Sequence, residues 1–370
     1  MVLLDIKLDN FLVFKDFEIC TSYPKKIVDS GIGKEHIEGK PNFRYKKLII
    51  LMGANATGKT ALGRILMTIF NFIANKEYSR IVELIDDNEK EAVFSLDFVQ
   101  ENTELYRISG RIAPKAGDDY QSGDIKVSVK KTAILANDNY EKCVERLERE
   151  SEGVFPSYIE ALESIPKISW GFEFPHETNS RFLVWRNRKP IYLSILKQTL
   201  MTLDPRIIDV VSVPGDQDVI SIRYPHCSVL MNKGRIIDKD ILSKGTVEGI
   251  GIAELIAAMK TSLDGFYYVD EKFSHIHSEA EKAFLSLLID LIGTNQQLFI
   301  TTHNSDILDM NIPKHSFAFL RRDETDNNHI SCVFASEYLK KNTLSVKNAV
   351  ENDVFSSAPD LSGIYKLKEL

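Results

Sequence analysis

The sequence predicts an α/β fold with a mixed sheet, an antiparallel β-subdomain and a helical insertion lobe. Short apolar runs that are typical of buried strands alternate with stretches of helical spacing, and this alternation indicates a parallel sheet. Three predicted strands end in polar groups, namely a glycine-rich loop, Asp270-Glu271 and His303. Because ligands of such sheets bind at the carboxyl ends of the strands, we expect these groups to form one site.

The glycine-rich loop is the most specific motif in the chain. It follows the apolar run Leu48–Met52 and matches G-x-x-x-x-G-K-[ST] through Gly53, Ala54, Asn55, Ala56, Thr57, Gly58, Lys59 and Thr60. A helix is predicted next, with Ala61 in its first turn, because apolar residues recur at helical spacing: Leu62, Ile65, Leu66, Ile69 and Phe70.

A strand, a glycine loop and a helix in this order form a P-loop, which binds a nucleotide. Its backbone N–H groups and the helix N-terminus bind phosphate. Lys59 is expected to reach the β- and γ-phosphates, and Thr60 to offer its hydroxyl to Mg²⁺. ATP and Mg²⁺ are therefore the predicted cofactors, with residues 53–61 contacting the nucleotide.

Composition limits the classes of protein that remain. The 370 residues include 46 basic and 53 acidic side chains, a net charge of −7, which gives no support to a general nucleic-acid coat but leaves a local basic patch open. The four cysteines form no C-x-x-C pair, which argues against a zinc site and for a reduced cytoplasmic protein. The sequence has no signal-peptide pattern and no apolar run of about 20 residues, so we expect no membrane span.

The N-terminal part, residues 1–136, is predicted to belong with the P-loop. Val2–Phe17 indicates two strands with a turn near Asp9-Asn10, and Glu91–Arg111 indicates an antiparallel hairpin. Residues 21–47 are predicted to form a loop or hairpin insertion with seven basic residues. Such a run is either a solvated face or a contact with the nucleotide base or a DNA strand.

Residues 137–205 are predicted to form a helical insertion lobe. Tyr140–Glu150, Ser157–Ile165 and Ile191–Leu203 have helical patterns. The segment 181–189 combines Trp185 with four basic residues, and such a mixture can hold phosphate and stack a base. The alternative is that Trp170 and Trp185 belong to the core and that the basic residues are solvated.

Residues 206–335 continue the predicted α/β pattern, and 336–370 form a C-terminal segment. The predicted strands are Ile207–Val213, Val219–Tyr224, Phe266–Asp270, Gln297–His303, Ser316–Leu320 and Ile330–Ala335. The predicted helices are Val247–Leu263 and Ala280–Ile292.

This order of motifs resembles an ABC-type ATPase. The P-loop, Leu242-Ser-Lys-Gly-Thr246, the apolar strand ending in Asp270-Glu271 and the segment Thr301-Thr-His-Asn-Ser-Asp-Ile-Leu308 carry the resemblance. Within that group the sequence is similar to the branch of SMC heads, recombination-repair ATPases and the OLD-like ATPases of bacterial phage-defence systems. The resemblance covers residues 1–110 and 205–335 and leaves the lobe between them unmatched.

The resemblance implies a role for each matching residue. Asp270 would coordinate Mg²⁺ together with Thr60, Glu271 would be the general base, and His303 would contact the γ-phosphate and the attacking water. Ser243, Lys244 and Gly245 would belong to the signature loop, which in this family binds ATP held by a second subunit. Gln100 is a candidate for the glutamine that touches Mg²⁺ and water in ABC-type ATPases.

The same residues also allow interpretations other than the catalytic one. An Asp-Glu pair after a strand is also typical of a helix N-cap, and a strand-end histidine is often structural. Lys244 replaces the usual glycine, so it either touches phosphate in the second subunit or is solvated. Thr246 and His277 replace the Gln or Glu and the Asp of most ABC proteins, as in OLD-like relatives.

The resemblance implies a homodimer or higher homo-oligomer that closes around ATP. Because Asp323, Glu324 and Asp326 lie in a predicted turn, residues 304–370 do not fit the TOPRIM nuclease of many OLD-like proteins. We therefore expect a separate effector, a nuclease or a toxin, and a sensor or regulatory role in anti-phage defence. The alternatives are a DNA-repair or chromosome-maintenance ATPase and an ATP-locked scaffold with negligible turnover.

Overall fold

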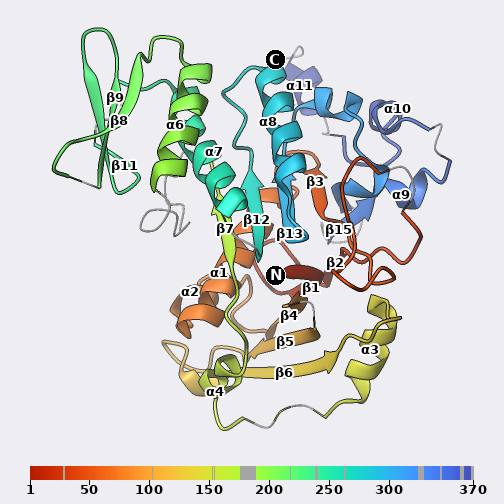
Figure 1. The fold of residues 1–370 in the computed structure, drawn as a ribbon. Coiled ribbons are helices and arrows are strands. Elements are labelled where there is room, and N and C mark those ends of the chain that lie inside the picture. The colour runs from red at the N-terminus through yellow and green to blue at the C-terminus, as the bar shows by residue number, and fades with distance from the viewer. Residues whose placement is uncertain are drawn as a thin grey trace.

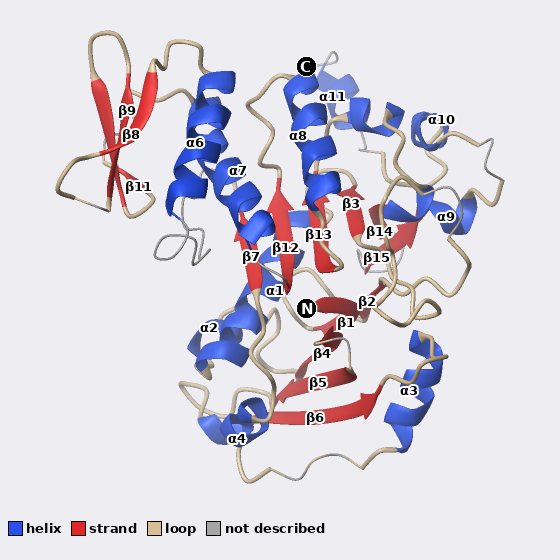
Figure 2. Cartoon of the chain, viewed as in Figure 1, coloured by secondary structure: helices blue, strands red, loops and turns tan. Residues whose placement is uncertain are grey.

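Three sheets organise the chain (Figures 1 and 2). The computed structural model describes residues 1–27, 30–101, 103–151, 153, 155–175, 189–216, 218–237, 241–261, 264–323, 329–341, 344–358 and 362–367. Among these residues, no helix has the length and apolar character needed to cross a membrane.

The central sheet contains six strands in the order β15-β14-β3-β13-β12-β7. All neighbours pair in parallel except β14 and β15, so the predicted mixed sheet is confirmed. In that order the strands are His329–Phe334, Phe317–Asp323, Leu48–Met52, Asn295–Thr301, Asp264–Asp270 and Trp170–Glu173.

Each face of the central sheet packs against a different layer, because successive side chains of a strand point to opposite faces. Leu48 and Ile50 of β3 join the core under α7 (Lys244–Thr261) and α8 (Ser278–Leu291). Ile49 and Leu51 of β3 join the core under α1 (Lys59–Asn75) and the antiparallel sheet. Burial on both faces explains why these strands are continuous apolar runs.

The second sheet is antiparallel, with the order β2-β1-β4-β5-β6. These strands are Phe17–Cys20, Val2–Asp9, Ala92–Gln100, Glu104–Ile112 and Ile125–Ala133. The predicted hairpin over residues 91–111 is confirmed. The second N-terminal strand begins later than expected, because residues 10–16 form a loop in which Asn10, Leu12 and Asp16 have positive φ.

Gln297 of β13 connects the central sheet to the antiparallel sheet. Its buried side chain accepts a hydrogen bond from the Leu3 N–H (2.9 Å) and donates to the Leu3 carbonyl (3.0 Å). The same Nε2 donates to the Lys46 carbonyl at 3.0 Å and to the Thr21 hydroxyl at 3.2 Å. One side chain therefore satisfies backbone groups of two segments that are distant in sequence.

The basic loop at residues 21–47 lies between β2 and β3, and its described residues form isolated bridges rather than strands. Two of its seven basic side chains are structural, which differs from both interpretations offered above. Lys46 donates to the Cys20 and Ser22 carbonyls, and Lys47 donates to the Gly33 and Ile292 carbonyls. Burial lowers the pKa of each ammonium to about 8.

The third sheet has the order β11-β10-β9-β8 and lies beside α6 (Figure 1). The strands are Arg235–Ile236, Ser228–Asn232, Val219–Arg223 and Asp209–Ser212, and α6 is Lys189–Leu203. The strands predicted near 207–213 and 219–224 are therefore present, but they belong to this separate sheet. Their inner residues, such as Ile220 and Ile222, share a core with α6 and α7.

The prediction of one helical lobe over residues 137–205 is corrected by these positions. α3 (Tyr140–Arg149) and α4 (Tyr158–Glu163) lie along the antiparallel sheet, while β7 is the edge strand of the central sheet. Of the described helices within 137–205, α6 is the one that lies beside the third sheet. The apolar run around Trp170 pairs with β12 because it matches that strand in burial on both faces, and its short length concealed it.

Short helices complete the chain. They are α2 (Ser79–Val82), α9 (Ala335–Tyr338), α10 (Val346–Glu351) and α11 (Ser362–Lys366), and the 3₁₀ turns are η1 (Ser122–Asp124), η2 (Ser305–Asp309) and η3 (Lys314–Ser316). Phe355 stacks on Phe319 of β14 with ring centroids 4.1 Å apart, so the C-terminal segment is attached to the central sheet. Glu324 and Asp326 lie outside the described residues.

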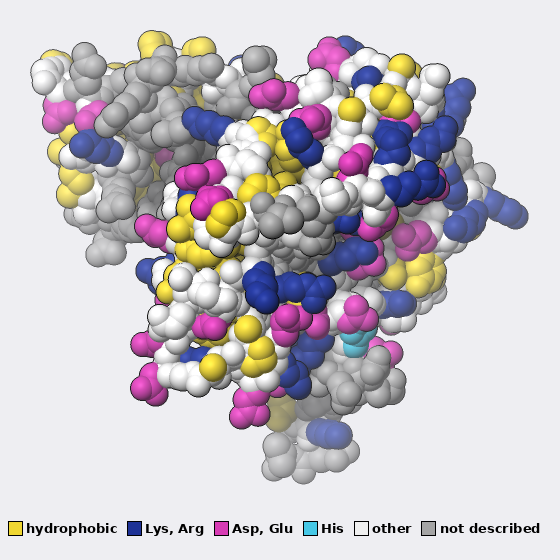
Figure 3. Space-filling model, turned by 90° about the horizontal axis from the view of Figure 1, so that it is seen from below, with side chains coloured by type: hydrophobic (Ala, Val, Ile, Leu, Met, Phe, Trp, Pro, Cys, Tyr) yellow, Lys and Arg dark blue, Asp and Glu magenta, His cyan; other side chains and the backbone are white. Residues whose placement is uncertain are grey.

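Acidic and basic side chains are interspersed over the face seen from below (Figure 3). The dark blue side chains are more numerous toward the edge where α9 and α10 lie in Figure 1. The charged side chains drawn on this face are therefore mixed in sign rather than gathered in one basic or acidic patch.

Asp5 of β1 is a buried carboxyl whose charge should make stability depend on pH. Burial, and next the charge of Asp97, raise the pKa of Asp5 from its ordinary 3.8 to about 7, against the attraction of Lys7 and Arg107. Its Oδ1 has no hydrogen-bond partner. The unfolded chain ionises this group near 3.8, so the free energy of unfolding should fall as the pH rises from about 4 to about 7.

We expect Asp5→Asn to remove that fall. Urea unfolding should show the variant gaining stability over the wild type between about pH 5 and about pH 8, since asparagine carries no charge to bury. Asp16→Asn, at an exposed position, serves as the control and should keep the wild-type dependence. If the free energies of unfolding of Asp5→Asn and the wild type differed by the same amount at all pH values, the explanation would be wrong.

Candidate functional site

The loop between β3 and α1 has the backbone of a phosphate-binding turn. Gly53, Ala56 and Gly58 have φ values of +150°, +61° and +96°. A Cβ at Gly53 would lie 2.5 Å from the Leu320 carbonyl oxygen, and a Cβ at Gly58 would lie 2.8 Å from the Phe14 ring. Both glycines are therefore required by conformation and by space.

The N-terminus of α1 has the features of an anion site. Gly58 is its N-cap and supplies no side-chain hydrogen bond, and the first turn contains no acidic residue. The first N–H groups of the helix are consequently left without a side-chain acceptor and carry the positive end of the helix dipole. Asn55 and Ala56 are exposed at this end, and Ala54 and Ala61 are half-buried beside them.

Lys59 is folded into the loop. Its ammonium donates to the Gly53 carbonyl at 2.9 Å and to the Ala54 carbonyl at 3.1 Å. Thr57 also donates to the Ala54 carbonyl, at 2.8 Å. Burial lowers the pKa of Lys59, whereas the nearby charges of Glu271 and Asp270 oppose that shift.

Asp270, at the end of β12, is bonded to two hydroxyls. Its Oδ2 accepts from Thr60 Oγ1 at 2.7 Å, and its Oδ1 accepts from Thr301 Oγ1 at 2.6 Å. Complete burial raises the pKa of Asp270, and these two hydrogen bonds act against that rise. A carboxylate and a threonine hydroxyl in contact are hard oxygen donors, so this pair fits Mg²⁺.

Glu271 follows with a strained backbone, at φ +44°. Its N–H points back to Thr301, 3.2 Å from the carbonyl and 3.0 Å from the hydroxyl. Its carboxylate Oε1 lies 2.7 Å from His303 Nε2, and both side chains are partly exposed, at 30% and 44%. A carboxylate and an imidazole can in this way face solvent at the mouth of a phosphate site.

The signature residues begin α7. Ser243 caps the helix, since its Oγ accepts from the Thr246 N–H at 3.1 Å. Ser243 and Lys244 are exposed, while Gly245 is packed so closely that a Cβ would lie 2.9 Å from the His275 carbonyl oxygen. Among the described residues, none of these three makes a hydrogen bond with residues 53–61 of the same chain.

Gln100, a further candidate, lies away from this site. Gln100 ends β4 beside Glu104, and β4 approaches the phosphate loop with its opposite end, where Val93 pairs with Asp9. Gln100 Nε2 instead donates to the Lys167 carbonyl at 3.2 Å, so the comparison with the water-binding glutamine is wrong.

Of the two tryptophans in the predicted lobe, the structure describes Trp170. Trp170 belongs to β7 and contacts Phe70 of α1 with ring centroids 5.8 Å apart, which supports the core interpretation for this tryptophan. Trp185 and the rest of segment 181–188 lie outside the described residues.

Three contacts around the loop had not been anticipated. Tyr268 of β12 donates its buried hydroxyl to the Lys59 carbonyl at 2.6 Å, and Arg322 of β14 donates to the Ala56 carbonyl at 2.5 Å. Thr301 bonds Asp270 as described above. Only Thr301 carried a sequence signal, because it belongs to the segment that ends the third polar strand.

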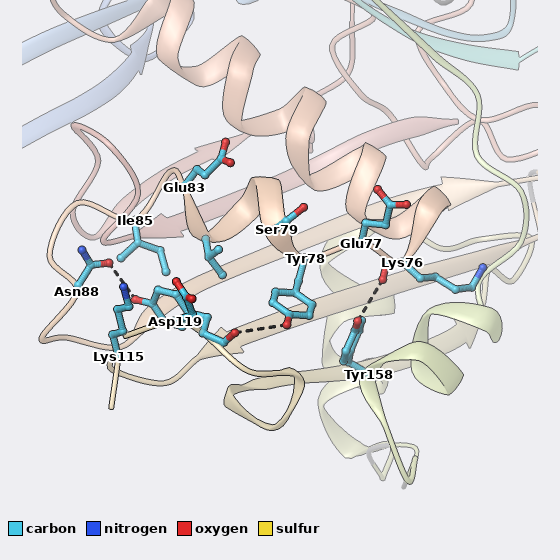
Figure 4. A pocket seen from close by; sticks show the side chains of 12 residues that line it. Lys76, Glu77, Tyr78, Ser79, Glu83, Ile85, Asn88, Lys115, Asp119 and Tyr158 are labelled. Atoms are coloured by element: carbon cyan, nitrogen blue, oxygen red, sulfur yellow. Dashed lines mark hydrogen bonds between the residues drawn. The ribbon is translucent and has the colours of Figure 1, made fainter. Parts of the chain in front are cut away.

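A cleft lies at the other end of α1 and is separate from this site (Figure 4). It is lined by Lys76, Tyr78, Lys115 and Tyr158, among others. The hydroxyl of Tyr158 donates to the Lys76 carbonyl, and that of Tyr78 to the Tyr120 carbonyl. Since α1 has 17 residues, the cleft is about 25 Å from Lys59.

Comparison with known proteins gives one family and a set of similar folds. The family model described as "AAA domain, putative AbiEii toxin, Type IV TA system" matches residues 48–309, which is more than half of the chain. No curated protein matches the sequence. A crystal structure of an SMC head bound to the C-terminal winged-helix domain of ScpA has a TM-score of 0.52 and 15% identity, over 94% of this chain and 100% of that one.

Two further SMC heads have TM-scores below 0.5. The head from Thermotoga maritima has a TM-score of 0.44 and 15% identity, over 90% of this chain and 99% of that one. The head with an extended coiled coil, bound to the C-terminal domain of ScpA derived from Pyrococcus furiosus, has a TM-score of 0.49 and 13% identity. The match covers 95% of this chain and 98% of that one. The SMC head with the TM-score of 0.52 shows that this chain has a fold similar to that of an SMC head.

The contact between Tyr268 and α1 predicts the effect of a small substitution. Gly63 lies directly above this ring, and a Cβ there would be 2.5 Å from Tyr268 Cε1. We expect Gly63→Ala to lower the free energy of unfolding by about 1–3 kcal/mol, because the buried ring cannot move away without losing its hydrogen bond.

Chemical denaturation tests this, with Gly123→Ala as the matched control, since a Cβ at Gly123 meets nothing within 4 Å. Equal stability of the two variants would show that Tyr268 does not hold α1 as described.

Proposed function

Because this chain belongs to the AAA-domain family described as putative AbiEii toxin, we propose that it binds ATP with Mg²⁺ and hydrolyses the γ-phosphate bond. The observation that supports this best is the convergence of three segments on one loop. Thr60, Asp270 and Thr301 are joined by hydrogen bonds, and Glu271 contacts His303 beside them.

In this proposal the phosphates lie against residues 53–61. The N–H groups at the start of α1 and the ammonium of Lys59 bind the phosphate oxygens, for which Lys59 exchanges its present carbonyl acceptors. Thr60 and Asp270 hold Mg²⁺, which when bound neutralises charge on the phosphate oxygens. To hold Mg²⁺, the Thr60 hydroxyl would have to release the Asp270 carboxylate, to which it donates in this structure.

Glu271 and His303 are proposed to act on the attacking water. Glu271 accepts a proton from the water as general base. His303 lies 2.7 Å from the Glu271 carboxylate and orients that carboxylate and the water toward the γ-phosphate. Their partial exposure supports this role, because a water molecule can reach them. The left-handed backbone at Glu271 is the kind of strain that functional sites retain.

We further propose that two copies close head to tail around ATP. Ser243 and Lys244 are exposed at the N-terminus of an 18-residue helix, which can point its positive dipole end at phosphate held by another subunit. Gly245 leaves room for the close backbone approach to His275. The same residues lack hydrogen bonds to the phosphate loop of their own chain, as noted above for the described part.

For the biological role we propose a sensor or regulatory ATPase of bacterial defence that controls a separate effector. The family description, which names an AbiEii toxin and a toxin–antitoxin system, favours this role. The SMC-head fold favours the second candidate, a DNA-repair or chromosome-maintenance ATPase. A nuclease or toxin gene beside this one would support the first, and turnover stimulated by DNA would support the second.

Lys59→Ala should abolish ATP binding, since the phosphates lose their principal cation while the loop backbone is retained. Isothermal titration calorimetry measures this directly, and Lys115→Ala, an exposed lysine in the distant cleft, should bind as the wild type does. Affinity close to the wild type in Lys59→Ala would disprove the assignment of the phosphate site.

Glu271→Gln should keep ATP binding but slow hydrolysis by about 10² or more, because a positioned base contributes roughly 10²–10⁴. Single-turnover hydrolysis tests this against Glu279→Gln, an exposed residue of α8 that should leave the rate unchanged. If the rate constant of Glu271→Gln equals that of the wild type, Glu271 is not the base.

A further inference from the structure

The segment that contains Glu271 needs external support. A residue with a side chain at φ +44° costs about 1 kcal/mol or more, and it keeps that conformation only where the surrounding structure imposes it. The N–H of Glu271 is bonded to Thr301, which fixes the start of the segment. The Ser274 N–H donates back to the Glu271 carbonyl at 3.2 Å, which closes a turn that must itself be held in place.

Glu248 of α7 supplies that support from below the turn. Its Oε2 accepts from the His275 N–H at 3.0 Å, and its Oε1 lies 2.6 Å from His275 Nδ1. The Ser274 hydroxyl donates to the same Oε1 at 3.2 Å. One carboxylate therefore contacts a backbone donor and two side chains within four residues of Glu271.

The burial of Glu248 restricts movement of the turn. The residue is only 2% exposed, and a buried carboxylate is tolerated only when its oxygens are bonded. Movement of the turn away from α7 would leave that carboxylate without its donors. The close contact of Gly245 with the His275 carbonyl holds the same turn at the start of the helix.

A second buried pair acts on the other side of Glu271. Lys272 lies 3.1 Å from Glu173 of β7, and both side chains are 2% exposed. Lys272 also donates to the Phe174 carbonyl at 3.2 Å. The turn is thus held between β7 and α7, with Glu271 presented to His303 on the open side.

We propose that Glu248 is a positioning residue, which holds the turn 271–275 so that the Glu271 carboxylate faces the phosphate site. This inference rests on the function proposed above. Glu248 does not touch the phosphate loop, whose residues 53–60 carry nucleotide affinity. Loss of Glu248 should therefore reduce kcat and leave ATP affinity nearly unchanged.

The test compares Glu248→Ala and Glu248→Gln with the wild type in three measurements: ATP dissociation constant, kcat and hydrogen exchange of the peptide covering 271–277. Glutamine keeps an acceptor for the His275 N–H, and alanine removes all contacts. Glu35→Gln is the matched control, since Glu35 is also a buried glutamate bonded to a histidine, 2.7 Å from His315 and remote from the site.

We expect kcat to fall roughly 10- to 100-fold in Glu248→Ala and less in Glu248→Gln, with the dissociation constant within about threefold of the wild type. Exchange of 271–277 should become faster in the same order. Glu35→Gln should lose stability without a change in kcat, which separates positioning from a general effect of a lost buried pair.

The proposal would be overturned if kcat of Glu248→Gln were within about twofold of the wild type and hydrogen exchange of 271–277 were unchanged. This outcome decides the question even if Glu248→Ala fails to fold. Glu271→Gln measured in parallel separates the two levels. If turnover falls in Glu271→Gln but not in the Glu248 variants, only the positioning role fails. If the wild type binds ATP without hydrolysing it, the proposed function and the positioning role fail together.

Discussion

The carboxylate of Asp270 joins the three elements on which the site depends. It ends β12, accepts one hydroxyl from α1 and another from β13, and is completely buried. Movement of any one of these elements would leave a buried charged oxygen without a donor, which costs several kcal/mol. The phosphate loop, the strand that carries Glu271 and the strand that leads to His303 are therefore positioned by the same two hydrogen bonds.

Much of this arrangement could be predicted, because the decisive residues are local in sequence. A buried strand, the glycine loop and the amphipathic helix are contiguous, and the glycines at positions 53 and 58 meet a steric demand that no other residue satisfies. Strands such as β12 and β13 were recognisable because burial on both faces produces continuous apolar runs. Long periodic segments and complete motifs carry this information without reference to the rest of the chain.

The remaining features depend on contacts between distant residues. The apolar run at β7 is four residues long, and only its pairing with β12 distinguishes it from a loop. Lys46 and Lys47 resemble a solvated basic run, yet carbonyl acceptors from other segments allow their burial. Gln100 was misplaced because a strand end does not reveal which end of its sheet faces the site. Glu248 carried no motif, since its partners lie 26 and 27 residues away.

The hydrogen bonds of Gln297 have a consequence for synthesis of the chain on the ribosome. Leu3 and Gln297 are 294 residues apart. Asp270 and Thr301 must both be synthesised before Thr60, at the start of α1, can join the hydrogen-bonded group that they form. At roughly 5–20 residues per second, the N-terminal strand waits on the order of 15–60 s for its central-sheet partner to be made. The apolar face that it later turns to the central sheet is exposed to other chains and to chaperones during that interval. The nucleotide site can become complete only when most of the polypeptide has emerged.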